Sequence, residues 1–411
     1  MIRPKRRKRG IRLHYNGLMK KGSGKKVVCA MSGGVDSSAA AALLKEDGYE
    51  VVGCFMRLGS EEEPEYDNLR VADCKIDPAR PRAHKQGCCS VNDAADARLV
   101  AATLGIPFYV LNFRKDFKRI MDYFTDEYNA GRTPNPCVRC NDWLKFGKMH
   151  AYAQSIGADF VATGHYARTD LSDPAHPKLL RGIDRSKDQS YVLFGAPRAQ
   201  LAHMLLPVGG MFKTEIRQIA ETRGLPVFNK PDSQEICFVP DNDYARLVEK
   251  RTPGGFKNGD IVDSEGKKVG THAGHQHFTL GQRRGLVALG YPVYVVDKNP
   301  DTHVVTVGRK EELFSTGCHA DQTNWLADPP LSWRRCRVKV RYNSPPVPAQ
   351  VRAYVNESGA DALEMRFDAP LEAVTPGQAV VCYGLEGAVD EDAVLGGGWI
   401  NQISRIIESP S

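Results

Sequence analysis

The 411-residue sequence contains no apolar run long enough to cross a bilayer, which excludes a helical membrane protein. No signal peptide precedes the first apolar segment, so we expect a cytoplasmic protein. The chain also has no repeat of the length that builds solenoids. Its 11 cysteines are an odd number, and in a reducing compartment they serve as free, ligating or catalytic thiols rather than as structural disulfides.

Acidic residues are absent from the first 25 residues, where arginine and lysine crowd together. This composition predicts a disordered basic tail over 1–25. The whole chain carries a net charge of +7 and has a pI near 8.7. Such a balance suits a nucleic-acid partner, but it is equally compatible with a mildly basic protein that binds none.

The most informative segment is 31–38, Met-Ser-Gly-Gly-Val-Asp-Ser-Ser, which follows an apolar run and opens an alanine-rich one. The pattern predicts a strand, a tight glycine turn and a helix. Adjacent glycines and hydroxyls at a helix N-terminus form a phosphate cradle. No Gly-Lys-Ser/Thr follows, so this is not a Walker A loop. Asp36 would repel phosphate unless a cation such as Mg²⁺ bridged the two.

Strand and helix patterns alternate as far as residue 163, which predicts a doubly wound parallel sheet. Strands are expected at 50–56, 107–113 and 158–163, a long loop at 58–86, and a helix over 141–156. From residue 277 onward short alternating runs predict a small antiparallel barrel. We therefore expect a nucleotide-binding α/β domain over 26–205, a connecting domain over 206–270 and a C-terminal β-barrel over 271–411.

Two other segments have the composition expected for sulfur chemistry. Cys137 and Cys140 lie three apart in a proline-stiffened loop before a helix, and arginines are close in sequence. A helix N-terminus and nearby cations both favour a thiolate. Structural zinc needs a second pair, and the adjacent Cys88 and Cys89 have poor spacing for one tetrahedral ion. Cys237 lies in a polar segment, unlike a typical core thiol.

Eight segments, in this order, resemble the bacterial tRNA-specific 2-thiouridylases over nearly everything after Lys26. They are 31–38, 87–90, 104–113, 131–141, 163–166, 187–191, 232–238 and 279–285.

The resemblance implies an ATP-dependent enzyme that thiolates the wobble uridine in the anticodon loop of tRNA, with Mg²⁺. ATP would adenylate O2 of the base and release pyrophosphate. Cys237 matches the cysteine that carries a persulfide from a sulfur-relay donor protein, and Cys140 the partner nucleophile. The two would form a transient disulfide while AMP leaves. The implied ATP contacts are Ala30, Met31, Ser32, Gly33, Gly34, Val35, Asp36, Ser37, Met56 and Gly164.

The same resemblance implies a set of tRNA contacts. These are Asn135, Pro136, Cys137, His165, Lys187, Asp188, Gln189, Arg341, Tyr342 and Gln378. Without the resemblance most of them would be read as structural: a charged run such as 187–189 is usually solvated, and Gln378 follows a Pro-Gly turn. Arginine next to tyrosine at 341–342 is also a means of stacking RNA bases.

One position departs from the family pattern. Many members have an aspartate where this chain has Cys137, so three thiols are available: Cys137, Cys140 and Cys237. Three thiolates are enough to hold a [4Fe–4S] cluster with one open iron. A cluster that carries the sulfur in place of a persulfide is therefore an alternative route.

Two other functions compete with tRNA thiolation. An amide-forming ligase of the argininosuccinate or GMP synthetase type would use the same glycine loop but needs no paired thiols. A non-catalytic RNA-binding protein with ATP as a structural ligand would release no pyrophosphate.

Overall fold

The computed structural model describes residues 24–59, 91–232, 236–239 and 243–405. Three expectations lie outside these residues: the basic tail up to residue 23, most of the long loop expected at 58–86, and the cysteine pair at 88–89. No helix in the described part of the chain is long and apolar enough to cross a membrane.

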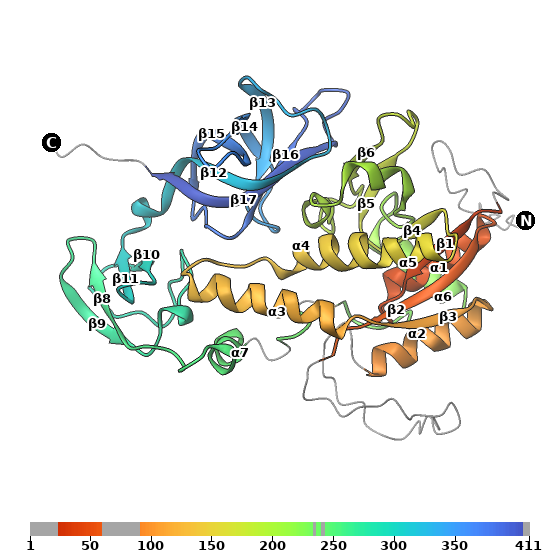
Figure 1. The fold of residues 1–411 in the computed structure, drawn as a ribbon, viewed down its shortest axis with the longest axis horizontal. Coiled ribbons are helices and arrows are strands. Elements are labelled where there is room, and N and C mark those ends of the chain that lie inside the picture. Colours follow the sequence, from red (N-terminus) through yellow and green to blue (C-terminus); the bar gives the residue numbers. More distant parts are fainter. Residues whose placement is uncertain (1–23, 60–90, 233–235, 240–242, 406–411) are drawn as a thin grey trace, which may run out of the picture.

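A five-stranded parallel sheet is the first of three main sheets (Figure 1). Its strands, in spatial order, are β3 (Phe108–Asn112), β2 (Glu50–Arg57), β1 (Lys26–Ala30), β4 (Phe160–Ala162) and β7 (Met204–Leu205). Val27 and Cys29 of β1 pack into one core, whereas Val28 and Ala30 pack into another. Side chains alternate along a strand, so both faces of this sheet are covered. The predicted doubly wound fold is confirmed.

Helices from different parts of the chain cover the two faces. On one side lie α1 (Val35–Glu46), α2 (Val91–Leu104) and α6 (Lys213–Thr222). On the other side α5 (Met149–Ser155) contributes Met149 and Ala153. A long helix, α3 (Arg114–Asn129), packs beside α4 (Pro136–Cys140) and η1 (Asn141–Lys148) and runs with them away from the sheet (Figure 1).

The helical run from α4 through η1 to α5 is unbroken, and its middle section, Asn141–Lys148, is a π-helix. The sequence predicts a helix only from residue 141. The structure begins it at Pro136, where a missing N–H costs nothing because first-turn N–H groups have no partner within the helix. Asn135 caps this end by accepting a hydrogen bond from Val138 N at 3.4 Å.

An antiparallel hairpin follows β4 and is formed by β5 (Ala167–Asp170) and β6 (Lys178–Arg181). Two short 3₁₀ helices follow, η2 (Ser190–Leu193) and η3 (Arg198–His203).

The part of the chain between the parallel sheet and the barrel forms a four-stranded sheet, which lies at one end of the molecule in Figure 1. Its order is β10 (Tyr294–Asn299), β11 (Val304–Gly308), β8 (Gly259–Asp263) and β9 (Lys268–His272), with α7 (Tyr244–Arg251) and η4 (His275–His277) beside it. The sequence analysis begins the C-terminal barrel at residue 271 and so assigns β10 and β11 to it. In the structure β11 instead pairs in parallel with β8, and Ile261, Val295 and Val305 share one core. The spacing of apolar residues within a strand does not indicate which distant strand it pairs with in parallel.

A closed six-stranded antiparallel barrel ends the chain, as predicted. Around it run β12 (Phe314–Trp325), β15 (Asp361–Glu372), β14 (Val347–Val355), β13 (Arg334–Lys339), β16 (Ala379–Tyr383) and β17 (Val394–Arg405), and η5 (Lys310–Leu313) leads into β12. The sequence analysis missed β12, because its inward positions carry small residues such as Ser315, Gly317 and Ala320 instead of an alternating apolar pattern.

Candidate active site

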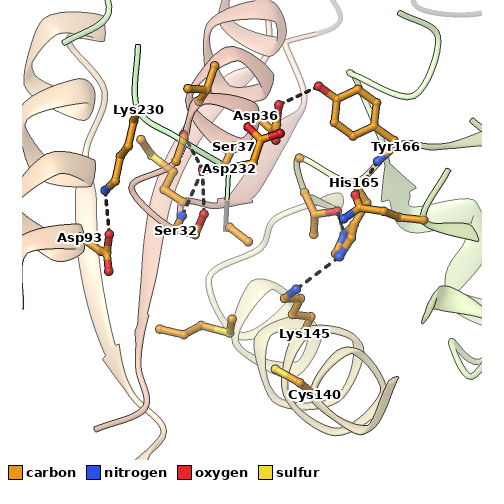
Figure 2. Close-up of a pocket in the computed structure, with 18 of the residues that line it drawn as sticks. Ser32, Asp36, Ser37, Asp93, Cys140, Lys145, His165, Tyr166, Lys230 and Asp232 are labelled. Carbon is orange, nitrogen blue, oxygen red and sulfur yellow. Dashed lines mark hydrogen bonds and ion pairs between the residues drawn. The ribbon is translucent and has the colours of Figure 1, made fainter. Parts of the chain in front are cut away.

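A cavity of about 340 Å³ lies at the carboxyl ends of β1, β2 and β4, where ligands bind in open parallel sheets (Figure 2). All the predicted ATP contacts except Gly33 line it. Among the other predicted site residues, Cys140, His165, Lys187, Gln189 and Tyr342 line the cavity as well. Tyr342 comes from the barrel, so two domains enclose one space.

The glycine turn is held open by its own hydroxyl groups. Ser37 Oγ accepts a hydrogen bond from Ser32 N at 3.1 Å, and Ser38 Oγ donates to Gly34 O at 2.8 Å. Gly33 has a φ of +74°, and a side chain there would collide with the Asp93 carbonyl. Gly34 caps α1 without a side-chain hydrogen bond, so no cap oxygen competes for the first-turn N–H groups. This geometry suits an anion.

Gly164, which follows β4, touches the start of α1. A Cβ at Gly164 would lie 2.6 Å from Ser37 N and 2.8 Å from Ser37 Cα. Only glycine therefore lets β4 approach the glycine turn this closely.

Charged side chains connect the turn to distant parts of the chain. Lys213 Nζ, at the start of α6, lies 2.7 Å from Asp36 Oδ1 and 2.8 Å from Asp232 Oδ1. Lys187 Nζ and Arg217 Nη2 also reach Asp232, at 3.0 and 2.7 Å. Burial opposes ionisation of Asp232, but Lys213 and Lys187 outweigh it and lower its pKa to about 2. The Asp232 carboxylate therefore stays charged.

Lys230 anchors the same region from the other side. Its Nζ donates to Gly33 O at 3.0 Å and to Asp93 Oδ1 and Asp96 Oδ2 at 2.7 Å each (Figure 2). We call this part of the cavity the anion end: residues 32–37 together with Lys213, Lys230 and Asp232. The sequence analysis did not select these three as site residues, because they lie about 180 to 200 positions from the glycine turn and have no distinctive spacing.

His165 lies opposite the anion end. Its Nδ1 is 2.7 Å from Thr163 Oγ1, and its Nε2 is 3.4 Å from Lys145 Nζ (Figure 2). Burial, with a further contribution from Lys145, lowers the His165 pKa well below 6.5. The imidazole is therefore neutral at physiological pH, and Nε2 accepts from the Lys145 ammonium.

Cys140 lines the cavity, and it packs on the same apolar cluster as Cys237, around Leu58, Ile120 and Leu144. We call Cys140, Lys145, Cys237 and this cluster the thiol end. Cys137 is exposed. Within the described residues, no group of three or more Cys, His, Asp or Glu side chains could hold a metal ion. The expected [4Fe–4S] set of Cys137, Cys140 and Cys237 is therefore not assembled.

The predicted tRNA contacts lie in three places. His165, Lys187, Gln189 and Tyr342 face the cavity. Asp188 does not, because its buried carboxylate accepts hydrogen bonds from Arg181 Nε at 2.9 Å and from Gly182 N and Ser190 N at 3.1 Å. Within the charged run 187–189, the Asp188 carboxylate therefore has a structural role in stabilising a turn.

The remaining predicted tRNA contacts lie where the barrel meets the cysteine loop. Gln378 Nε2 donates to Thr133 O at 3.0 Å and to Pro134 O at 2.9 Å, and its Oε1 accepts from Asn135 Nδ2 at 3.3 Å. Pro136 is buried at the start of α4. Arg341 donates to Ala373 O within the barrel, and burial lowers its pKa.

Three family models match consecutive parts of the chain. Residues 25–241 match a model described as the tRNA methyl transferase HUP domain, 250–309 the tRNA methyl transferase PRC-barrel domain, and 315–400 the aminomethyltransferase beta-barrel domain. The middle model ends close to the end of β11.

Curated relatives match over nearly the whole chain. A protein of Rhodopirellula baltica, named tRNA-specific 2-thiouridylase MnmA, is 47% identical over 403 residues, covering 91% of this chain and 96% of its own. A protein of the same name from Geotalea uraniireducens is 44% identical over 391 residues, covering 93% and 96%. Among solved structures, a 4-thiouridine synthetase–RNA complex with bound ATP has a TM-score of 0.33 and 17% identity over 56% of this chain and 51% of its own.

Proposed function

The chain belongs to the tRNA-specific 2-thiouridylase family and is a tRNA-uridine 2-sulfurtransferase, and we propose that it adenylates the wobble uridine and then transfers sulfur from Cys237. The feature that supports this most strongly is the single cavity, which is lined by the glycine turn at the anion end and by Cys140 at the thiol end.

The first step uses the anion end. ATP binds with its phosphates on the first turn of α1 and near Lys213 and Lys230, where N–H groups and ammonium groups offset negative charge. Uridine O2 attacks the α-phosphorus, and pyrophosphate leaves. Mg²⁺ is part of the ATP substrate. The carboxylate oxygens of Asp36 and Asp232, both paired with Lys213, are ligands of the type that Mg²⁺ prefers.

The second step uses the thiol end. The terminal sulfur of a Cys237 persulfide attacks C2 of the adenylated base, and AMP leaves with the C2–O bond electrons. The Cys140 thiolate then attacks Sγ of Cys237. The S–S bond of the persulfide breaks, its electron pair stays with the sulfur on C2, and a Cys140–Cys237 disulfide forms. A thiol reductant regenerates both cysteines.

The packing of Cys140 and Cys237 on one apolar cluster supports this step, because the two sulfurs must meet. No step is assigned to an iron–sulfur cluster, since the three thiols are not assembled among the described residues.

The proposal includes an anticodon loop at the mouth of the cavity. Lys187 and Tyr342 offer a cation and an aromatic ring there, which suit a phosphate and an unstacked base. A single-stranded loop gives up its base at lower cost than a duplex. A sulfur-relay protein would load Cys237, and the reaction would take place in the cytoplasm, where thiols remain reduced.

Incubation of the full chain with unmodified tRNA, ATP and a persulfide donor tests the proposal, with pyrophosphate and 2-thiouridine measured by enzymatic assay and mass spectrometry. We expect Cys140→Ser and Cys237→Ser to abolish 2-thiouridine while pyrophosphate release continues. Cys137→Ser is the matched variant and should still thiolate. Pyrophosphate release that neither serine substitution changes, with no 2-thiouridine formed even by the wild type, would favour an amide-forming ligase. Loss of thiolation in Cys137→Ser would favour the cluster route.

A further inference from the structure

The π-helix η1 gives the thiol end an unusual register. In an α-helix, residues five apart point about 140° away from each other. In a π-helix the hydrogen bonds run from i to i+5, so such residues lie on the same side of the helix, as residues four apart do in an α-helix. Cys140 directly precedes η1, and Lys145 is five residues later. Both side chains line the cavity, and both appear on the same side of the helix in Figure 2.

His165 positions the side chain of Lys145. Its Nζ lies 3.4 Å from Nε2 of His165, whose ring is neutral because of burial. Thr163 Oγ1, at 2.7 Å, accepts a hydrogen bond from Nδ1–H and so fixes the tautomer. An ammonium group has three N–H donors, and the imidazole uses one of them. The others remain for a negative group in the cavity.

We propose that Lys145 is a further catalytic residue of sulfur transfer, which holds Cys140 as its thiolate until that sulfur attacks Cys237. This inference rests on the proposed function. Lys145 gives up no proton in the step: the Cys140 electron pair forms the new S–S bond, and the persulfide bond breaks toward the sulfur on C2. The ammonium then faces the negative charge that develops on the sulfur bound to C2.

Other polar and charged groups that line the cavity do not supply a cation to Cys140 in place of Lys145. Asp36 and Asp232, at the anion end, are paired with Lys213. Lys187 lines the cavity but is bound to Asp232 at 3.0 Å. Tyr342 is a phenol on the barrel side, and burial raises its pKa, so it adds no charge.

Apart from Lys145, no charged side chain of the helical run from α4 to α5 or of α3, all within the described residues, lines the cavity. Burial of the Asp142 carboxyl raises its pKa to about 7. Arg139 turns toward the barrel, where Nη2 donates to Gln322 Oε1 at 2.7 Å. On α3, Asp116 pairs with Lys148 at 2.9 Å. The cation that η1 directs into the cavity beside Cys140 is therefore Lys145.

The test is the pH dependence of Cys140 alkylation by iodoacetamide, read at the level of the Cys140 peptide by mass spectrometry in the full chain. In the wild type we expect an apparent pKa at least about one unit below the 8.5 of an ordinary cysteine. Lys145→Met should move it up by one unit or more and slow alkylation at neutral pH by about tenfold. Lys145→Arg should retain most of the effect.

Lys148→Met is the matched control. Lys148 lies on the same helix, its side chain is 57% exposed, and it does not line the cavity. It should leave the Cys140 profile unchanged.

A wild-type apparent pKa of 8.5 or higher would overturn the inference without any variant, as would a Lys145→Met profile that overlays the wild type. Tryptophan fluorescence of each variant establishes that it is folded. The two proposals fail differently: absence of 2-thiouridine from wild-type reactions refutes the function, whereas normal thiolation with an unshifted Cys140 profile refutes only the role of Lys145.

Discussion

The anion end and the thiol end of the cavity are held in place by different kinds of contact. At the anion end, Lys213 forms ion pairs with Asp36, 177 residues away in sequence, and with Asp232. At the thiol end, Cys140 and Cys237 pack on apolar side chains. Arg139, beside Cys140, stacks on the barrel residue Trp399 at 3.7 Å from the ring centroid.

Because of this difference, we expect the two ends to be affected by different kinds of substitution. At the anion end, ion pairs position the groups that must meet a charged ligand. Pyrophosphate release should therefore fall when a charge is removed or when a side chain pushes the closely packed backbones apart. At the thiol end, apolar packing positions the thiols. Stability and thiolation should therefore change when a substitution alters a buried group or the contact between the barrel and the cysteine helix. Four substitutions test this contrast.

The largest effect is expected from Gly164→Ala. Its Cβ would lie 2.6 Å from Ser37 N, which forces β4 and the start of α1 apart. We expect pyrophosphate release to fall by roughly 10³-fold, because displacing the first turn of α1 by even an ångström misplaces the phosphates. Gly210→Ala is the control, since nothing lies within 4 Å of a Cβ there. Equal rates in the two variants would show that the close approach is not needed.

Removal of the shared cation should have the next largest effect. Lys213→Met leaves Asp36 and Asp232 facing each other without the ammonium that lies 2.7 and 2.8 Å from them. Pyrophosphate release should slow by about 10²-fold and ATP affinity should weaken. Lys268→Met removes an exposed pair with Asp260 and should change neither. Equal pyrophosphate release and ATP affinity in Lys213→Met and Lys268→Met would contradict the view that ion pairs organise the anion end.

A buried carboxyl on η1, between Cys140 and Lys145 in sequence, gives a smaller, pH-dependent effect. The folded protein holds the Asp142 proton up to about pH 7, because burial raises its pKa from 3.8, whereas the unfolded chain releases it near 3.8. Wild-type stability is therefore lost as pH rises from about 4 to about 7 and is flat above. Asp142→Asn should lack this loss and exceed the wild type by on the order of 2 kcal/mol at pH 8.

Urea unfolding at several pH values measures this difference. Asp361→Asn, at an exposed position that begins β15, should parallel the wild type throughout. Parallel curves for Asp142→Asn and the wild type would mean that water or a counter-charge reaches the carboxyl.

The anion end was largely predictable from the sequence, and the reason is local. Glycines, hydroxyls and Asp36 lie in one short segment between an apolar strand and an alanine-rich helix, so spacing alone gives strand, turn and helix. The residues that complete it, Lys213, Lys230 and Asp232, lie far along the chain and are brought in by α6 and the segment after it. Nothing in their local sequence indicates this.

The thiol end was less predictable, because its geometry depends on packing between domains. The sequence predicts a helix near Cys140 but not the π-turn that aligns Cys140 with Lys145. It also gives no sign of β12, which carries Gln322 at a positive φ of 48° and presents it to Arg139. Such irregular positions are set by tertiary contacts rather than by periodicity.

The smallest effect is expected where the barrel docks on the cysteine helix. Arg139→Lys keeps the charge but loses the planar group that stacks on Trp399 and reaches Gln322, so stability should fall by about 1 kcal/mol. Thiolation should drop a few-fold while pyrophosphate release is unchanged, because only the thiol end is loosened. Arg119→Lys is the control: Arg119 also stacks on a ring, Trp143 at 3.9 Å, but from an exposed position on α3. If Arg139→Lys lowered pyrophosphate release as much as thiolation, the two ends would be coupled through the barrel, and the division between charge and packing would not hold.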